Sequence, residues 1–300
     1  MDLKCAKISN HANNIMNPDN AIAVIQGQRG VACLACGVNL PKADSQSAPA
    51  NIANIITESF MKRPALRQEA YDGIFRRAND RLLLDQSPQF PAQASTSAVF
   101  FLKNKFVMAT AGDNVIFHFV NGVLQQVFTG DMGADPVCLG HVRYSSPKTG
   151  EELTFGKGEN TFLICSRKFA QAFTENQIEE ALLRATHTTQ KGSKTISEVQ
   201  CDRWLRALWD NIGGMNDADD YSAIAFTLPA KKKSAKTLVI VIVVALLLAA
   251  AIFFGLGFIK RANGGPNPPA PPSQNQDVDY NNAERPVGPN GETPPDPPKR

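Results

Sequence analysis

The chain lacks several of the sequence patterns by which common classes of protein are recognised. It contains no G-x-x-x-x-G-K-[ST] loop, which argues against the phosphate cradle of P-loop nucleotide-binding proteins. It has one C-x-x-C, formed by Cys33 and Cys36, and no second C-x-x-C or H-x-x-x-H that would complete a zinc site. No internal repeat is visible, which argues against a solenoid or propeller.

An excess of charge of one sign is also missing from most of the chain. Residues 1–230 carry 22 Lys and Arg against 23 Asp and Glu, and the net charge of +3 arises from basic residues that follow them. The sequence pI of about 8.5 therefore gives no reason to expect a nucleic-acid partner.

Residues 237–259 are the one long apolar run, and they contain no charged side chain. At about 1.5 Å of rise per residue, a helix of this length crosses a hydrocarbon core roughly 30 Å thick. We therefore predict a single transmembrane helix, which lies too far from the N-terminus to be a signal peptide. Basic residues flank it: Lys231, Lys232, Lys233 and Lys236 precede it, and Lys260 and Arg261 follow it.

This distribution of basic residues predicts the orientation of the chain in a membrane. More of them precede the span than follow it, so the positive-inside rule places residues 1–230 in the cytoplasm and residues 260–300 outside the cell membrane. The basic segment 231–236 is expected to contact lipid head groups, which makes the membrane a predicted partner. Residues 260–300 hold more than half of the 20 prolines and are predicted to form a disordered Pro-rich tail.

All six cysteines precede the apolar run, and most lie within apolar stretches. A reducing cytoplasm favours buried thiols over disulfides for such residues. Cys33 and Cys36 lie in a strand-like run, where side chains three positions apart point to opposite faces. We interpret them as buried thiols, with half of a zinc site or a redox pair as the alternative.

Hydrophobic periodicity predicts an α+β domain over residues 1–230, with helices packed on antiparallel strands. Asn121-Gly122 joins two apolar runs and predicts a hairpin, and Thr174 with Gln177 predicts a capping box at a helix start. Helical spacing appears in three sets: Leu66, Ala70, Ile74, Ala78 and Leu82; Ile178, Ala181, Leu182 and Ala185; and Cys201, Leu205, Leu208 and Ile212. Strands are predicted over residues 21–25, 31–35, 98–102, 106–111, 115–120, 123–128, 161–165 and 223–228.

Short stretches along residues 3–228, taken in order, resemble the motifs of the metal-dependent protein phosphatases of type 2C. They are Asn17-Pro18-Asp19-Asn20-Ala21, Ala35-Cys36-Gly37, Ser95-Thr96-Ser97-Ala98, Ala109-Thr110-Ala111-Gly112-Asp113-Asn114 with Thr129-Gly130-Asp131, Leu163-Ile164-Cys165-Ser166-Arg167-Lys168 and Asp219-Asp220-Tyr221-Ser222. The resemblance implies an antiparallel β-sandwich flanked by helices. It also implies a site for two Mg²⁺ or Mn²⁺ ions, held by acidic residues at several of these stretches.

Two of the acidic positions that the resemblance implies are not acidic in this chain. Asp19 and Asp219 keep the carboxylate, whereas Cys36 stands at the position of the bridging aspartate and Arg167 at that of another aspartate. A thiol is a soft ligand poorly suited to Mg²⁺, and a guanidinium stays charged and repels a metal ion. We therefore expect no bound metal, with two Mg²⁺ or Mn²⁺ ions expected only if the chain is an active phosphatase.

Arg167 is open to two interpretations. In the first, its guanidinium takes the place of a metal ion and pairs with Asp19 and Asp219, whose carboxylates would otherwise repel each other. In the second, its side chain points to solvent from a loop.

The sequence thus predicts a single-pass membrane protein with a catalytically impaired phosphatase-like domain. Its expected role is that of a binding or regulatory module in Ser/Thr phosphorylation signalling, with a Ser/Thr kinase or a phosphoprotein as partner. Two alternatives stay open. One is an active metal-dependent phosphoserine/phosphothreonine phosphatase with an atypical metal site, and the other is a structural component of an envelope assembly.

Overall fold

The computed structural model describes residues 4–10, 20–38, 47–85, 92–142, 144, 146–187, 198–213 and 220–228. The chain divides after Lys232 into two units, and all described residues belong to the first. Asp19, Asp219 and segments 231–236, 237–259 and 260–300 lie outside the described residues, so the predictions made for them stand as predictions. Within the described part, no helix combines the length and the apolar character that crossing a bilayer requires.

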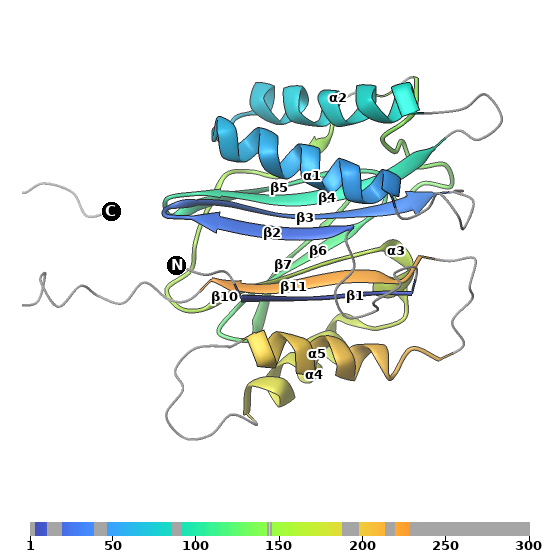
Figure 1. Cartoon of the computed structure of the whole chain (residues 1–300). Helices are drawn as coiled ribbons and strands as arrows, with labels where there is room; N and C mark the ends of the chain where they lie inside the picture. Colours follow the sequence, from blue (N-terminus) through green and yellow to red (C-terminus); the bar gives the residue numbers. More distant parts are fainter. Residues whose placement is uncertain are drawn as a thin grey trace, which may run out of the picture. The chain divides into compact units, whose positions relative to one another are not determined.

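Two antiparallel sheets form the centre of the first unit (Figure 1). The first sheet has the order β1 (Lys4–Ser9), β11 (Ser222–Leu228), β10 (Asn160–Cys165), β6 (Val115–Val120) and β7 (Val123–Thr129). The second has the order β2 (Ala21–Gln26), β3 (Arg29–Val38), β4 (Gln93–Leu102), β5 (Lys105–Ala111) and β8 (Lys148–Thr149), and β9 (Leu153–Thr154) also pairs with β5. The strands predicted from the sequence are all present.

Helices cover the outer face of each sheet (Figure 1). α1 (Ser47–Lys62) and α2 (Gln68–Asp85) pack on the second sheet, and α4 (Glu175–His187) and α5 (Glu198–Trp209) pack on the first. A short helix, α3 (Arg167–Gln171), follows β10 directly. The α+β sandwich flanked by helices is therefore confirmed for the described residues.

Strand alternation distributes the apolar side chains between the inner and the outer faces of the sheets. In β10, Phe162 and Ile164 pack between the sheets, whereas Leu163 and Cys165 pack against α4 and α5. Cys33 and Cys36 likewise lie on opposite faces of β3, Cys33 beneath α1 and α2 and Cys36 between the sheets. This confirms that they do not form a common site. None of the six cysteines, all of which are described, forms a disulfide, and all except the half-buried Cys5 are buried.

The two local signals in the sequence are both confirmed. Asn121 and Gly122 have φ angles of 53° and 83°, the left-handed conformation that a tight β-hairpin requires at both positions. At the start of α4, the Gln177 backbone N–H donates to Thr174 Oγ1 at 3.3 Å, and the Thr174 N–H donates to Gln177 Oε1 at 2.8 Å. This reciprocal pair is the capping box, which satisfies two backbone donors that the helix itself cannot.

Candidate functional site

One end of the sandwich collects the strand ends that carry the phosphatase-like motifs. β1, β3, β5 and β10 finish there, and β4, β6 and β11 begin there. Side chains join these ends across the sheets: Asn20 Nδ2 donates to the Ala35 carbonyl at 2.9 Å and lies 3.5 Å from Ser222 Oγ. Antiparallel pairing thus brings residues from distant parts of the sequence to one end of the sandwich. We call this end, formed where β1, β3, β5 and β10 finish and β4, β6 and β11 begin, the strand-end site.

The turn between β5 and β6 is built around Ser95, which lies at the start of β4 opposite Cys36. Ser95 Oγ accepts hydrogen bonds from the backbone N–H groups of Asp113 at 3.0 Å and Asn114 at 3.2 Å. Asn114 Nδ2 in turn donates to the Ser95 carbonyl at 3.1 Å. The turn therefore holds the Asp113 backbone in a fixed position at the strand-end site.

Two glycines allow the backbone around this turn to pack closely. Gly112 has a φ of +106°, and a Cβ there would lie 2.5 Å from Ser95 Oγ. A Cβ on Gly130 would lie 2.1 Å from the Gly112 carbonyl oxygen, which accepts a hydrogen bond from the Asp131 N–H at 2.7 Å. Neither position accommodates a side chain without movement of the backbone.

Cys36 occupies the end of β3 as a buried thiol, with 3% of its surface exposed. Burial is the main cause that raises the pKa of this thiol well above its ordinary value, and the carboxylates of Asp220 and Asp113 raise it further. The thiol is therefore protonated at neutral pH. To bind a cation the thiol would have to lose this proton, and the resulting soft thiolate suits Mg²⁺ poorly.

Arg167 begins α3 directly after Ser166, whose Oγ accepts the Phe169 N–H and caps the helix. The Arg167 Nη1 group donates to the Gly133 carbonyl at 3.0 Å and lies 4.0 Å from Asp113 Oδ2. The two charged side chains are 29% and 21% exposed. Arg167 thus lies at the start of a helix rather than in a loop, and its side chain is partly exposed. The pairing with Asp19 and Asp219 is untested, because both lie outside the described residues.

Replacing Arg167 by Ala is expected to destabilise the protein by about 1 kcal/mol, because it removes one charged hydrogen bond and a half-screened ion pair. Thermal or urea unfolding would measure the change. The control is Arg203→Ala on α5, since Arg203 is exposed and has no hydrogen bond or ion pair within the described residues. An equal effect of the two substitutions would show that the contacts of Arg167 contribute nothing to stability.

Asp113 is a residue of the strand-end site that the sequence did not predict as a site residue. Its motif, Gly112-Asp113-Asn114, was visible, but nothing in the sequence indicated that its carboxylate lies beside Arg167. Asp113 also lies near Cys138, where burial first, and then Asp113, Asp135 and Asp131, raise the pKa of the thiol to about 12. The strand-end site is thus acidic, with Arg167 as a cation within it.

Two described side chains at the strand-end site, the Cys36 thiol and the Arg167 guanidinium, are unsuited to holding hard divalent cations. Within the part of the chain that the structure covers, no group of three or more His, Cys, Asp or Glu is arranged to hold a metal ion. The resemblance to the type 2C phosphatases implies aspartates, with oxygen ligands for the metal, at these two positions. Asn20 and Asp220 directly follow the two predicted aspartates in the sequence, and both lie at the strand-end site.

The chain matches no protein-family model and no curated protein sequence, but its structure resembles several solved phosphatases. A bacterial serine phosphatase is 12% identical, with 77% of this chain and 100% of that chain covered and a TM-score of 0.54. The catalytic domain of the serine/threonine protein phosphatase PstP, solved with two manganese ions, is 14% identical over 75% and 97% of the two chains, with a TM-score of 0.53.

A third similar structure is PppA of Pseudomonas aeruginosa, described as a key regulatory component of the T6SS. It is 14% identical over 75% of this chain and 97% of that one, with a TM-score of 0.51. Structural similarity at sequence identities this low establishes the fold but not the activity. The described part of the chain therefore has the fold of the metal-dependent serine/threonine phosphatases of type 2C.

Proposed function

We propose that this protein is a membrane-anchored, catalytically impaired phosphatase-like protein that acts as a binding or regulatory module in Ser/Thr phosphorylation signalling. The observation that carries the proposal is the pair of changes at the strand-end site. Cys36 is buried and neutral, and Arg167 is a fixed cation bonded to Gly133 and close to Asp113. The described residues around them keep the two-sheet fold.

The two changes act on metal binding by different physical routes. Two divalent ions bring four positive charges to one place and need several carboxylates to balance them. Cys36 removes a negative charge, whereas Arg167 adds a positive one beside Asp113, a carboxylate that would otherwise be free to bind a metal. A softer metal ion tolerates a thiolate ligand, but every metal cation is repelled by the guanidinium.

A site of this kind is suited to holding a partner rather than to hydrolysis. Arg167 uses one N–H group for the Gly133 carbonyl, and a guanidinium has five such donors in a planar fork. The remaining donors suit a phosphate or carboxylate group of a partner protein. A Ser/Thr kinase or its phosphorylated target is the partner that the proposal implies, and the predicted anchor at residues 237–259 would hold the complex at the membrane.

The test uses the full-length chain in detergent micelles and a phosphothreonine peptide, with Mn²⁺ added or removed by a chelator. We expect no hydrolysis above background at any Mn²⁺ concentration and no Mn²⁺ binding by calorimetry. Mn²⁺-dependent turnover that is lost in Asp19→Ala and kept in Asp210→Ala, a change on an exposed aspartate near the end of α5, would overturn the proposal.

The active-phosphatase alternative has one observation in its favour. Asp113 and Asp220 both lie close enough to Cys36 to raise its pKa, so carboxylates are present around the altered position. If the site were only two substitutions from activity, the double variant Cys36→Asp with Arg167→Asp would bind Mn²⁺ and hydrolyse the peptide. This double variant shows whether two substitutions are enough to give the unmodified chain Mn²⁺ binding and phosphatase activity.

A further inference from the structure

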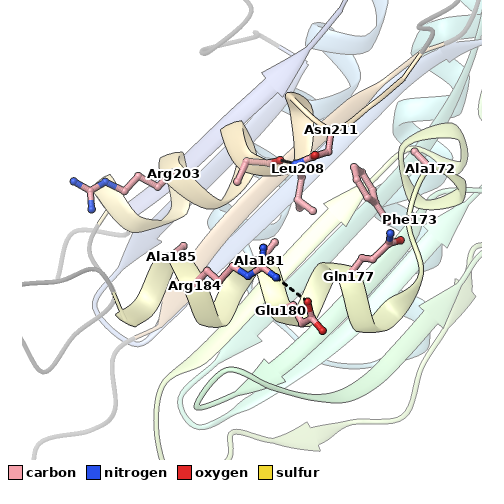
Figure 2. Close-up of a pocket in the computed structure, with 11 residues that line it drawn as sticks. Ala172, Phe173, Gln177, Glu180, Ala181, Arg184, Ala185, Arg203, Leu208 and Asn211 are labelled. Carbon is pink, nitrogen blue, oxygen red and sulfur yellow. Dashed lines mark hydrogen bonds and ion pairs between the residues drawn. The ribbon is translucent and has the colours of Figure 1, made fainter.

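A groove of about 540 Å³ runs between α4 and α5 (Figure 2). These two helices lie on the face of the unit opposite to α1 and α2 (Figure 1). The groove exists because small side chains face it from both helices: Ala181 and Ala185 on α4, and Ala207 on α5. The larger apolar residues of α4, Ile178 and Leu182, are instead buried against the sheet. The groove therefore follows from the placement of alanines and not from poor packing beneath it.

The floor of the groove is apolar and its rim is polar. Leu208 and Ala185 are buried at the bottom, and Phe173 and Ala181 are half-buried beside them. The exposed side chains of Gln177, Glu180, Arg184, Arg203 and Asn211 surround this floor. An apolar centre within a polar rim is the usual anatomy of a protein–protein contact, and a volume of this size is enough for a few side chains.

The charges on the two walls are not balanced. On α4, Arg184 forms an ion pair with Glu180 at 3.1 Å. On α5, Arg203 is exposed and has no hydrogen bond or ion pair within the described residues, whereas its neighbour Arg206 pairs with Asp202 at 3.0 Å. Figure 2 shows Arg203 at one end of the groove and Phe173 at the other. The groove thus presents an apolar end and a cationic end.

We propose that this groove binds a short peptide segment of a partner protein that carries an apolar side chain and, further along, an acidic one. The apolar side chain packs against Phe173 and Leu208, and the carboxylate meets the guanidinium of Arg203. Arginine suits this contact because its planar fork of N–H groups matches the two oxygens of a carboxylate. This binding site is additional to the proposed function, since the groove lies on α4 and α5 and not at the strand-end site.

To test this proposal, peptides that bind the full-length chain in detergent micelles are selected from a phage-displayed library of random short peptides. The Ala207→Arg variant, which fills the groove from an exposed position, serves for counter-selection. Selected peptides are expected to combine an apolar residue with Asp or Glu. Their affinity, measured by fluorescence anisotropy, is expected to fall about tenfold in Arg203→Glu and to stay unchanged in Arg206→Glu, a matched change outside the groove.

Three results would overturn the proposal. One is a selection that yields no peptide sensitive to Ala207→Arg. Another is a set of groove-dependent peptides without acidic residues, or with equal sensitivity to Arg203→Glu and Arg206→Glu. The third is self-association of the chain that Ala207→Arg abolishes, which would assign the groove to a second copy. Unfolding temperatures equal to that of the unmodified chain would show that each variant is folded.

Discussion

Replacing Cys36 by Asp is expected to destabilise the protein by about 3–5 kcal/mol at neutral pH, because it leaves an uncompensated charge in the interior. The position is 3% exposed and lies near the carboxylates of Asp220 and Asp113. A third carboxylate there loses its hydration and is repelled by two others. The uncharged substitution Cys36→Asn, which has nearly the same size as Asp, is the matched control and is expected to cost less.

The pH dependence of this variant has a definite sign. Burial and like charges raise the pKa of the new carboxyl in the folded state above its unfolded value of about 3.9. The folded state then binds more protons than the unfolded state between the two values, so the destabilisation relative to Cys36→Asn grows as the pH rises through this window. Urea unfolding of both variants between acidic and neutral pH measures the difference.

Adding Mn²⁺ tests whether the carboxylate of Cys36→Asp destabilises the protein because no metal ion can bind beside it. We expect no recovery of stability in Cys36→Asp when Mn²⁺ is added, because Arg167 still holds a positive charge beside Asp113. Full recovery in this single variant would mean that Arg167 does not exclude a metal, and it would contradict the central argument for an impaired site.

Gly112→Ala is expected to cost about 2–4 kcal/mol in the free energy of unfolding. The φ of +106° is strained for any residue with a Cβ, and that Cβ would lie 2.5 Å from Ser95 Oγ. To relieve this clash, the turn has to move away from Ser95. That movement breaks the hydrogen bonds that the Asp113 and Asn114 N–H groups donate to Ser95 Oγ. The loss would therefore combine backbone strain with two broken contacts.

Gly73→Ala is the matched control for this prediction. Gly73 lies within α2 and is exposed, and a new Cβ there would have no atom within 4 Å apart from its chain neighbours and the backbone of its own helix. Alanine lowers the backbone entropy of the unfolded chain and favours the helix, so this change is expected to stabilise the protein by roughly 0.5–1 kcal/mol. Opposite signs for the same substitution in thermal unfolding support the account of Gly112. A loss below 1 kcal/mol at Gly112 would show that the turn moves without cost.

Local patterns predicted the elements of this fold because their causes are local. Asn121-Gly122 forms a hairpin turn through its own φ angles, and Thr174 and Gln177 cap α4 through contacts three residues apart. The opposite placement of Cys33 and Cys36 follows from the two-residue period of one strand. The helical spacing predicted the helix ends less exactly, because Leu66 precedes the start of α2 and Ile212 follows the end of α5.

The strand-end site could be predicted only in part. The motifs predicted Cys36 and Arg167 to be altered site positions, and both lie at the end of the sandwich where the strands converge. The partners of Arg167 were not predictable, because Asp113 and Gly133 are more than thirty residues away and reach it through two different strand connections. The groove between α4 and α5 could not be predicted from the sequence either, because it depends on how two separate helices pack.

The sequence by itself determined the α+β class and the strands and helices, and it predicted that a thiol and a guanidinium stand at two positions where the resemblance implies acidic residues. It did so because periodicity, turn chemistry and residue type are properties of neighbouring residues. The tertiary structure alone decided that Cys36 is buried and neutral, that Arg167 contacts Gly133 and Asp113, and that Arg203 faces an open groove. Those properties depend on burial and on contacts between distant segments, which only the packing of the two sheets and their helices fixes.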